Sequence, residues 1–251
     1  RFHGPAQPSR KYISVQSGRS HIPQKRRLFP DKIITFAKHV PEMAFSGTYQ
    51  PLAPTIVRGK YLIMEENSKT ALLIIDMQRD FVEPRAVLCV AGAAATVPAI
   101  DALARRGREL GWAIIHIVRA HRADGSDAEP ARRHLFADSS GYCVAGTRGA
   151  EIVDGISVCT SDITVVKTRF SGFFRTDLDS ILSRLGTRRI VVAGTQYPNC
   201  IRATAVDALM RDYEVTVCTD CCSAADEQTA RANVADMRRM GIWCLPAADI
   251  R

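Results

Sequence analysis

The chain has 251 residues, which is enough for one α/β domain with a large buried core. It is 46% hydrophobic and 24% charged and has no uninterrupted apolar stretch near about 18 residues, which excludes wholesale disorder, a coiled coil and a membrane span. The formal charge of +8 is concentrated in residues 1–63, which hold 11 Lys and Arg against two acidic residues. The other 188 residues carry 23 basic and 24 acidic residues, so charge does not favour a nucleic-acid-binding surface.

Residues 1–63 lack a hydrophobic period and are rich in Arg, Lys, Ser and Pro. We expect this basic leader to be mostly disordered and to lie outside the folded domain, residues 64–251. Two interpretations stay open. Basic, acid-poor, Ser-containing leaders resemble organelle transit peptides, which would send the protein to a plastid or mitochondrion. Alternatively, Met64 is the natural start, the leader is an extension without function, and the protein is cytoplasmic.

From Thr70 onward, short apolar runs alternate with amphipathic segments. The runs predict buried strands at residues 70–75, 113–118, 163–166, 190–193, 215–219 and 242–245. Apolar side chains at helical spacing predict helices near residues 97–110, 178–185, 201–210 and 227–240. This alternation predicts one three-layer α/β/α, Rossmann-like domain with a mostly parallel six-stranded sheet.

The eight cysteines match no disulfide or zinc framework. No Cys-x-x-Cys pair recurs with a matching His or Cys pair, and the adjacent Cys221 and Cys222 are badly placed to bridge each other. We therefore expect most of the cysteines to be small buried hydrophobic side chains, with Cys200 as the exception.

Three residues able to carry chemistry follow three different predicted strands. Asp76 ends the first run, Lys167 follows the third, and Cys200 lies a short loop after the fourth. Taken singly, they are explained as a helix cap, an exposed charge and a thiol packed under a loop. Because ligands bind beyond the carboxyl ends of parallel strands, we expect all three at one edge of the sheet. The start of the helix after Cys200 predicts a lowered thiol pKa.

The segments around these residues read DMQRDF at 76–81, KTRFSGF at 167–173 and CIRATA at 200–205, with VAGTRGAE at 144–151. In this order and spacing they resemble the isochorismatase-like cysteine hydrolase superfamily. That superfamily includes nicotinamidases, N-carbamoylsarcosine amidohydrolases and ureidoacrylate amidohydrolases. The resemblance extends from about residue 70 to about residue 225.

The resemblance implies a catalytic triad with Cys200 as nucleophile, Asp76 as general base and Lys167 as the cation that holds both anions. It also implies an oxyanion hole made by the backbone N–H groups of Gln196 and Cys200. The same family places a cis peptide bond before the first of these residues, here between Thr195 and Gln196.

Four residues are candidates to line the substrate pocket: Phe81, Arg119, Phe170 and Tyr197. For the two phenylalanines a plain core role is an equal alternative. Arginines 119, 169, 175 and 202 are candidates to hold a substrate carboxylate through a bidentate fork, although surface solvation explains most of them.

We expect no metal and no other cofactor in the reaction. Metal-binding nicotinamidases carry an Asp-x-His pattern after the second strand, whereas this chain reads VRAHRAD at 118–124. His121 and His134 alone fit solvated or hydrogen-bonded histidines better than metal ligands.

The leading hypothesis is an amidohydrolase that cleaves a small amide or carbamoyl C–N bond through a thioester and releases ammonia. A vinyl-ether hydrolase of the isochorismate type is the first alternative, disfavoured because such members do not require the thiol. A catalytically silent binding or assembly subunit stays open because Tyr197-Pro198 departs from the nicotinamidase loop. A redox role for the adjacent Cys221 and Cys222 is weakest. The expected partners are a small amide or ureido substrate and further copies of the chain, without nucleic acid or membrane.

Overall fold

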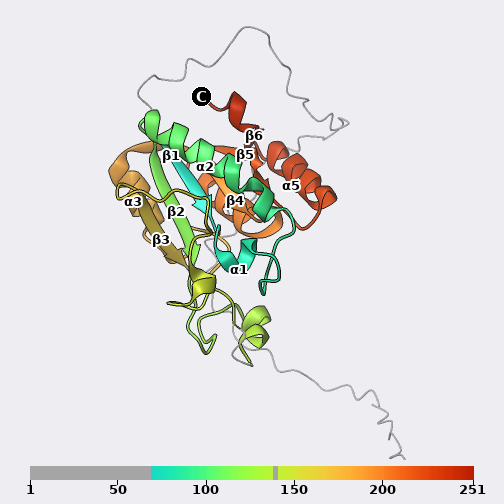
Figure 1. Cartoon of the computed structure of the whole chain (residues 1–251). Coiled ribbons are helices and arrows are strands. Elements are labelled where there is room, and N and C mark those ends of the chain that lie inside the picture. The colour runs from blue at the N-terminus through green and yellow to red at the C-terminus, as the bar shows by residue number, and fades with distance from the viewer. Residues whose placement is uncertain (1–68, 138–140) are drawn as a thin grey trace, which may run out of the picture. The chain divides into compact units, whose positions relative to one another are not determined.

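The computed structural model describes residues 69–137 and 141–251, which form a six-stranded sheet covered by helices on both faces (Figure 1). The leader predicted for residues 1–63 lies outside the described residues. Within the described part of the chain, no helix has the length and apolar character needed to cross a membrane.

All six predicted strands are present, and each pairs in parallel with its neighbours. The strand order across the sheet is β3-β2-β1-β4-β5-β6. The strands are β1 (Lys69–Ile75), β2 (Ala113–Arg119), β3 (Ile163–Lys167), β4 (Thr187–Thr195), β5 (Glu214–Ser223) and β6 (Trp243–Leu245).

The predicted helices are present as well, together with short turns that hydrophobic periodicity did not predict. The α-helices are α1 (Arg79–Val82), α2 (Ala93–Glu109), α3 (Leu178–Leu185), α4 (Arg202–Leu209) and α5 (Glu227–Arg239). The shorter turns are η2 (Pro130–Phe136), η3 (Arg148–Ala150), the π-helical η4 (Tyr197–Ile201) and η5 (Ala247–Asp249).

The side chains of β1 show how the three layers form. Ala71, Leu73 and Ile75 pack with residues of α3, α4 and α5 on one face, whereas Leu72 and Ile74 pack with α1 and α2 on the other. Successive side chains of a strand point to opposite faces, so a strand that is apolar throughout must be covered twice. The prediction of a three-layer α/β/α domain is confirmed.

The strand order reverses between β1 and β4, at the centre of the sheet. After β1 the chain continues to α2 on one face of the sheet, and after β4 it continues to α4 on the other face. In open parallel sheets, ligands bind at such a point, beyond the carboxyl ends of the two strands. Gly194 of β4 pairs with Ile75 of β1 at this point and has a φ of +122°. A Cβ on Gly194 would lie 2.1 Å from the Ile75 carbonyl oxygen, so only glycine allows the strands to approach here.

β5 contains a wide bulge. Val192 of β4 pairs with Val217, and the next pair along β4 is Gly194 with Cys222. Between these two pairs β5 advances by five residues while β4 advances by two. Residues 218–221 therefore leave the ladder with β4, while Cys218 still pairs with Leu245 of β6.

Candidate active site

The structure brings Asp76, Lys167 and Cys200 together at the carboxyl edge of the sheet. Lys167 Nζ donates a hydrogen bond to Asp76 Oδ2 at 2.7 Å and lies 3.4 Å from Cys200 Sγ. The ammonium also donates to the Arg169 carbonyl oxygen at 3.1 Å. Asp76 and Lys167 are 1% exposed and Cys200 is 6% exposed, so neither a surface lysine nor a simple helix cap explains the arrangement.

Asp76 is the first residue beyond β1 and has a φ of 51°, in the left-handed region that few residues other than glycine adopt. Its N–H donates to the Ile117 carbonyl oxygen at 2.8 Å, which holds this bend against β2. Its Oδ1 atom is buried and has no hydrogen-bond partner among the described residues. That oxygen is therefore free to receive a proton.

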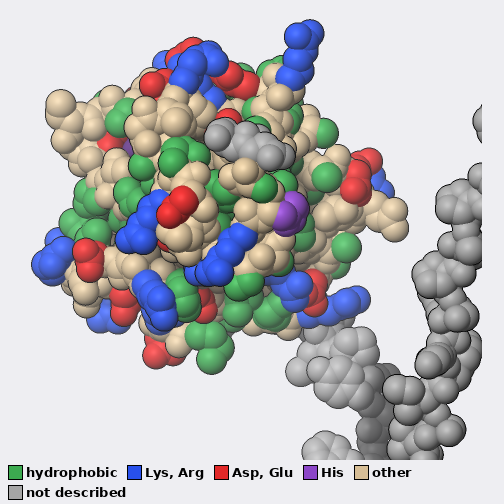
Figure 2. All heavy atoms as spheres, turned by 90° about the horizontal axis from the view of Figure 1, so that it is seen from below, with side chains coloured by type: hydrophobic (Ala, Val, Ile, Leu, Met, Phe, Trp, Pro, Cys, Tyr) green, Lys and Arg blue, Asp and Glu red, His purple; other side chains and the backbone are tan. Residues whose placement is uncertain are grey.

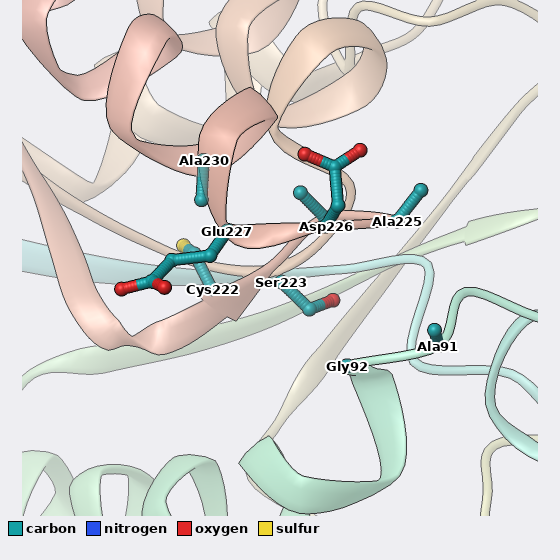
Figure 3. Close-up of a pocket in the computed structure, with 9 residues that line it drawn as sticks. Ala91, Gly92, Cys222, Ser223, Ala225, Asp226, Glu227 and Ala230 are labelled. Atoms are coloured by element: carbon teal, nitrogen blue, oxygen red, sulfur yellow. The ribbon is translucent and has the colours of Figure 1, made fainter.

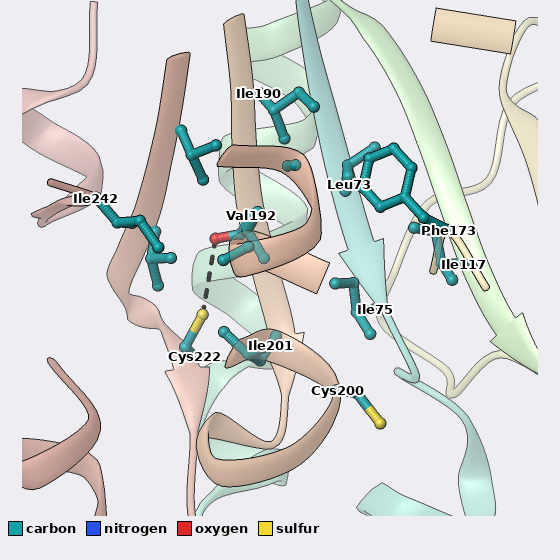
Figure 4. Packing of buried hydrophobic residues seen from close by; sticks show 14 of the residues in the cluster. Leu73, Ile75, Ile117, Phe173, Ile190, Val192, Cys200, Ile201, Cys222 and Ile242 are labelled. Carbon is teal, nitrogen blue, oxygen red and sulfur yellow. Dashed lines mark hydrogen bonds between the residues drawn. The ribbon is translucent and has the colours of Figure 1, made fainter. Parts of the chain in front are cut away.

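Cys200 lies in the π-helical turn η4, immediately before α4. The Gln196 carbonyl oxygen accepts hydrogen bonds from the N–H groups of Asn199 at 3.2 Å and Ile201 at 3.3 Å. Single π-helical turns are frequent at functional sites. Figure 4 shows the Cys200 sulfur directed away from Ile201 and from the apolar side chains of the cluster. The peptide bond between Thr195 and Gln196 is cis, as the resemblance implied.

Arg119, the last residue of β2, places a second positive charge at the thiol. Its Nη2 atom lies 3.6 Å from Cys200 Sγ, and its Nη1 atom donates to Glu129 Oε1 at 2.8 Å. The guanidinium lies 5.5 Å from the ring centre of Phe170 and is fully buried. The thiol is thus flanked by two cations from two strands.

Gln78 holds the end of β2 in place, a role that the sequence pattern did not reveal. Its Oε1 atom accepts the Arg119 N–H at 2.6 Å, and its Nε2 atom donates to the carbonyl oxygens of Arg119 and Ala150, both at 2.7 Å. A buried amide that satisfies backbone groups of two separate segments fixes both. The one feature of the sequence that could have indicated this role is the position of Gln78, two residues after Asp76 in DMQRDF.

The predicted lowering of the Cys200 pKa is wrong for this arrangement. Burial raises the pKa of Cys200 most and the Asp76 charge adds to it, while Lys167 and Arg119 act in the opposite direction without cancelling the rise. The sequence indicated a cation near the thiol but not how completely the thiol is removed from water. The thiol is therefore neutral at rest.

The ion pair between Arg119 and Glu129 is strongly held. Burial by itself would lower the pKa of Arg119, but the charges of Asp76 and Glu129 outweigh it and raise that pKa. For Glu129, burial acts to raise the pKa and the Arg119 charge overcomes it, so the pKa is lowered. Both groups stay charged at neutral pH.

The four predicted pocket residues separate into two groups. Arg119 lies 3.6 Å from the thiol, and Phe170 packs against the Arg119 guanidinium. Phe81 packs edge-on against Tyr142, with ring centres 6.1 Å apart, in the core on the α2 side. Tyr197 is 2% exposed and donates its hydroxyl to the Thr219 carbonyl oxygen at 3.2 Å, so its ring belongs to the core near β5.

The other arginines considered for a substrate carboxylate have partners elsewhere. Arg169 donates to the carbonyl oxygens of Asp127 and Thr168, Arg202 pairs with Asp236, and Arg175 lies over the Phe174 ring.

The two histidines near this region have different surroundings. His121 is buried with Nδ1 3.3 Å from Asp127 Oδ1, and burial together with the Arg119 charge lowers its pKa. His134 is exposed. This agrees with the interpretation of His121 as a hydrogen-bonded histidine.

The surface around the carboxyl edge is of mixed character. Figure 2 views the molecule from the side on which α1 lies in Figure 1, and shows Lys and Arg side chains interspersed with acidic and hydrophobic ones. An open groove of about 400 Å³ lies between the starts of α2 and α5 (Figure 3). Its lining residues include Gly92, Cys222, Ser223, Asp226 and Glu227 and none of Asp76, Lys167 and Cys200. These last three side chains are buried.

Comparison with known proteins agrees with this fold. The isochorismatase domain family model matches residues 70–249. The chain therefore belongs to the isochorismatase family, whose members include hydrolases that act on amides.

The names of individual relatives differ in the activity that they state. A protein of Arabidopsis thaliana named probable inactive nicotinamidase is 44% identical over 176 residues, covering 69% of this chain and 90% of the relative. The ureidoacrylate amidohydrolase of Caulobacter vibrioides is 28% identical over 229 residues, covering 82% of this chain and 96% of the relative. The crystal structure of an isochorismatase family protein from Desulfovibrio vulgaris superposes with a TM-score of 0.71 at 55% identity, covering 72% of this chain and 96% of that one.

Proposed function

We propose that this chain is a cysteine-dependent amidohydrolase that cleaves the C–N bond of a small amide or ureido compound and releases ammonia. The observation that carries the proposal is the position of Cys200 Sγ, 3.4 Å from Lys167 Nζ and 3.6 Å from Arg119 Nη2, with Asp76 bound to the same ammonium. A neutral amide is a poor electrophile, and this arrangement supplies both a thiolate and a group that takes its proton.

The first step is a proton transfer inside the site. The proton of Cys200 Sγ passes to the unpartnered Asp76 Oδ1, and Lys167 and Arg119 stabilise the resulting thiolate. The transfer leaves the net charge of the buried site unchanged, so it avoids the desolvation cost of releasing the proton to water. The raised thiol pKa is compatible with this route, because thiol and carboxyl titrate as a coupled pair.

The remaining steps use the same groups. The thiolate attacks the substrate carbonyl carbon, and the oxyanion is placed at the backbone N–H groups of Gln196 and Cys200. The protonated Asp76 returns its proton to the leaving nitrogen, which departs as ammonia and leaves on Cys200 a thioester from an amide or a thiocarbamate from a ureido compound. A water molecule that gives its proton to Asp76 then hydrolyses this intermediate.

We further propose that the substrate carries a negatively charged group. The guanidinium of Arg132, a half-buried residue, lies 4.8 Å from the ring centre of Phe170 and 5.9 Å from that of Tyr142. Arg119 lies against the same two rings, so two guanidinium groups share one aromatic cluster, and one of them is 3.6 Å from the thiol. Guanidinium groups bind carboxylates through paired hydrogen bonds.

The test is ammonia release from a panel of small amides and ureido compounds, with and without a carboxylate. We expect turnover by the unmodified chain and by Cys222→Ser, a control whose sulfur faces the Val192 carbonyl oxygen (Figure 4). Cys200→Ala should be inactive, and denaturing mass spectrometry of quenched reactions should find the acyl group on Cys200. Ammonia release that survives Cys200→Ala would contradict the proposal.

A binding subunit without catalysis is the second candidate. It is favoured by the burial of the thiol, which raises the pKa of Cys200, and by the name of the Arabidopsis relative. On this alternative, a compound of the panel raises the melting temperature of the unmodified chain and of Cys200→Ala equally, and no ammonia appears with either.

A further inference from the structure

The bulge in β5 brings together two thiols and a carboxylate that take no part in the proposed reaction. The sulfur atoms of Cys218 and Cys221 and a carboxylate oxygen of Asp220 all lie within 4.8 Å of one another. Cys218 Sγ lies 3.2 Å from Asp220 Oδ1. In a regular strand, residues three apart point to opposite faces. The bulge turns both sulfur atoms to the same side.

This cluster is separate from the candidate active site. Cys218 and Cys221 belong to the core on the α2 side of the sheet, whereas Cys200 and Cys222 belong to the core on the opposite side. The run Cys218-Thr219-Asp220-Cys221 has Cys-x-x-Cys spacing, but without a second pair it carried no weight as a sequence pattern.

We propose that Cys218, Asp220 and Cys221 bind a thiophilic divalent cation of the zinc class. Two thiolates and a carboxylate are a ligand set that this class of cation prefers over magnesium or calcium. Both thiols are fully buried while Asp220 is exposed. A cation would therefore enter from the side of the carboxylate. A water molecule on that side would be the fourth ligand of a tetrahedral site.

A divalent cation would bind this set of ligands by displacing the thiol protons.

Neighbouring contacts hold the cluster in shape. Asp220 Oδ1 accepts the N–H of Ala247 at 2.8 Å, which ties the bulge to η5. The hydroxyl of Tyr197 donates to the Thr219 carbonyl oxygen, which ties the bulge to η4. A bound cation would therefore stabilise the contact between β5 and the segment that follows β6.

The test uses the full chain carrying Cys200→Ala, so that the thiol of the proposed active site cannot bind the probe. The reduced, metal-free protein is titrated with Co²⁺ while thiolate-to-cobalt charge-transfer absorption is followed. We expect the signal to saturate at one equivalent and to disappear when Zn²⁺ displaces Co²⁺. Zn²⁺ should also raise the melting temperature, because it binds the folded chain.

Three variants and one matched control locate the ligands. Cys218→Ser and Cys221→Ser should each lose the absorption, while Cys222→Ser, the adjacent residue on the opposite face, should keep it. Asp220→Asn keeps an oxygen acceptor for the Ala247 N–H but lacks the charge, and should weaken Co²⁺ binding about tenfold or more.

Two outcomes would overturn the proposal. One is a folded Cys200→Ala protein that shows no thiolate absorption, or shows it undiminished in the double variant Cys218→Ser/Cys221→Ser. The other is a Cys218–Cys221 disulfide in peptides from the unreduced protein, which would assign the pair to redox chemistry.

A further measurement needs no serine variant, in case those variants do not fold. Zn²⁺ should slow alkylation of Cys218 and Cys221 under mild denaturation more than that of the buried Cys222 and Cys244. Equal effects at all four cysteines would also count against the site. None of these readouts depends on amidohydrolase activity.

Discussion

At the scale of single residues, the thiol of Cys200 is governed by opposing influences, of which burial is the largest. Burial and the Asp76 charge favour the neutral thiol, and two cations favour the thiolate. Because Lys167 and Arg119 come from different strands, each can be removed without deleting the other. The contribution of each charge to the reactivity of the sulfur is therefore separately measurable.

Removing either cation should slow alkylation of Cys200. We expect Lys167→Met and Arg119→Met each to reduce the rate with iodoacetamide at neutral pH by about tenfold, because an opposite charge at contact distance shifts a pKa by about one unit or more. Peptide mapping over time gives the rate for Cys200 separately from the exposed Cys89 and Cys159. Arg169→Met is the matched control, since that guanidinium donates to the Asp127 and Thr168 carbonyl oxygens. An unchanged rate in both cation variants would refute this account.

The buried pair of Asp76 and Lys167 should be more sensitive to loss of one partner than to loss of both. Asp76→Asn leaves the ammonium without its counter-charge and should lower the free energy of unfolding by about 3–5 kcal/mol. The double variant Asp76→Asn/Lys167→Met removes the unpaired charge and should recover part of that loss. Urea denaturation of the three proteins measures the difference. A double variant less stable than Asp76→Asn would show that the side-chain packing of Lys167 matters more than its charge.

At the scale of elements, the sequence predicted the framework well because the strands are buried on both faces. A continuous apolar run such as residues 70–75 has only one stable placement, inside a parallel sheet covered twice. The positions of Asp76 and Lys167 at the ends of such runs, and of Cys200 a short loop after another, therefore predicted their meeting at one edge. The helix ends were also predictable where glycine follows, as at Gly186, which has a φ of +66°.

The elements that sequence patterns did not predict are those fixed by tertiary contacts. The bulge in β5 begins within the predicted run 215–219 and continues past its end, and no residue pattern marked it, so its two sulfur atoms could not be placed on one side. The burial of Arg119 depends on Gln78 and Glu129, which lie 41 and 10 residues away from it. The wrong sign for the Cys200 pKa has the same origin, because a sequence shows charges but not their desolvation.

The contact between β1 and β4 should be intolerant of any side chain at Gly194. Gly194→Ala places a methyl group against the Ile75 backbone and should destabilise the protein by about 4 kcal/mol or more while abolishing turnover. Gly111→Ala is the matched control, with a φ of +74° and no atom within 4 Å, and should cost about 1–2 kcal/mol. Thermal unfolding of both variants measures the two effects. If both variants lose the same stability, the positive φ of Gly194 explains the need for glycine there, and the close approach of the two strands does not.

At the scale of the whole molecule, two buried histidines should make stability fall on mild acidification. Burial lowers the pKa of His116 and, with the Arg119 charge, that of His121, both from 6.5. As the pH falls through about 6.5, the unfolded chain takes up protons that the folded chain does not, so the free energy of unfolding decreases.

The double variant His116→Gln/His121→Gln should therefore show a flatter dependence of melting temperature on pH between about pH 7 and pH 5. His134→Gln, at an exposed histidine, should keep the slope of the unmodified chain. Equal slopes in all three proteins would assign the acid sensitivity to carboxylates instead.

The last prediction concerns the basic leader. Both hydrophobic clusters, the six strands and the residues of the proposed active site lie within residues 69–251. A chain that begins at Met64 should therefore keep the melting temperature of the full chain to within a few degrees, as well as its activity. The truncation also changes the net charge from +8 to −1, so solubility must be compared at matched ionic strength. Loss of stability in the truncated chain at every salt concentration would show that residues 1–63 are part of the folded unit. Loss of solubility confined to low salt would instead reflect charge, and would leave the boundary at Met64 intact.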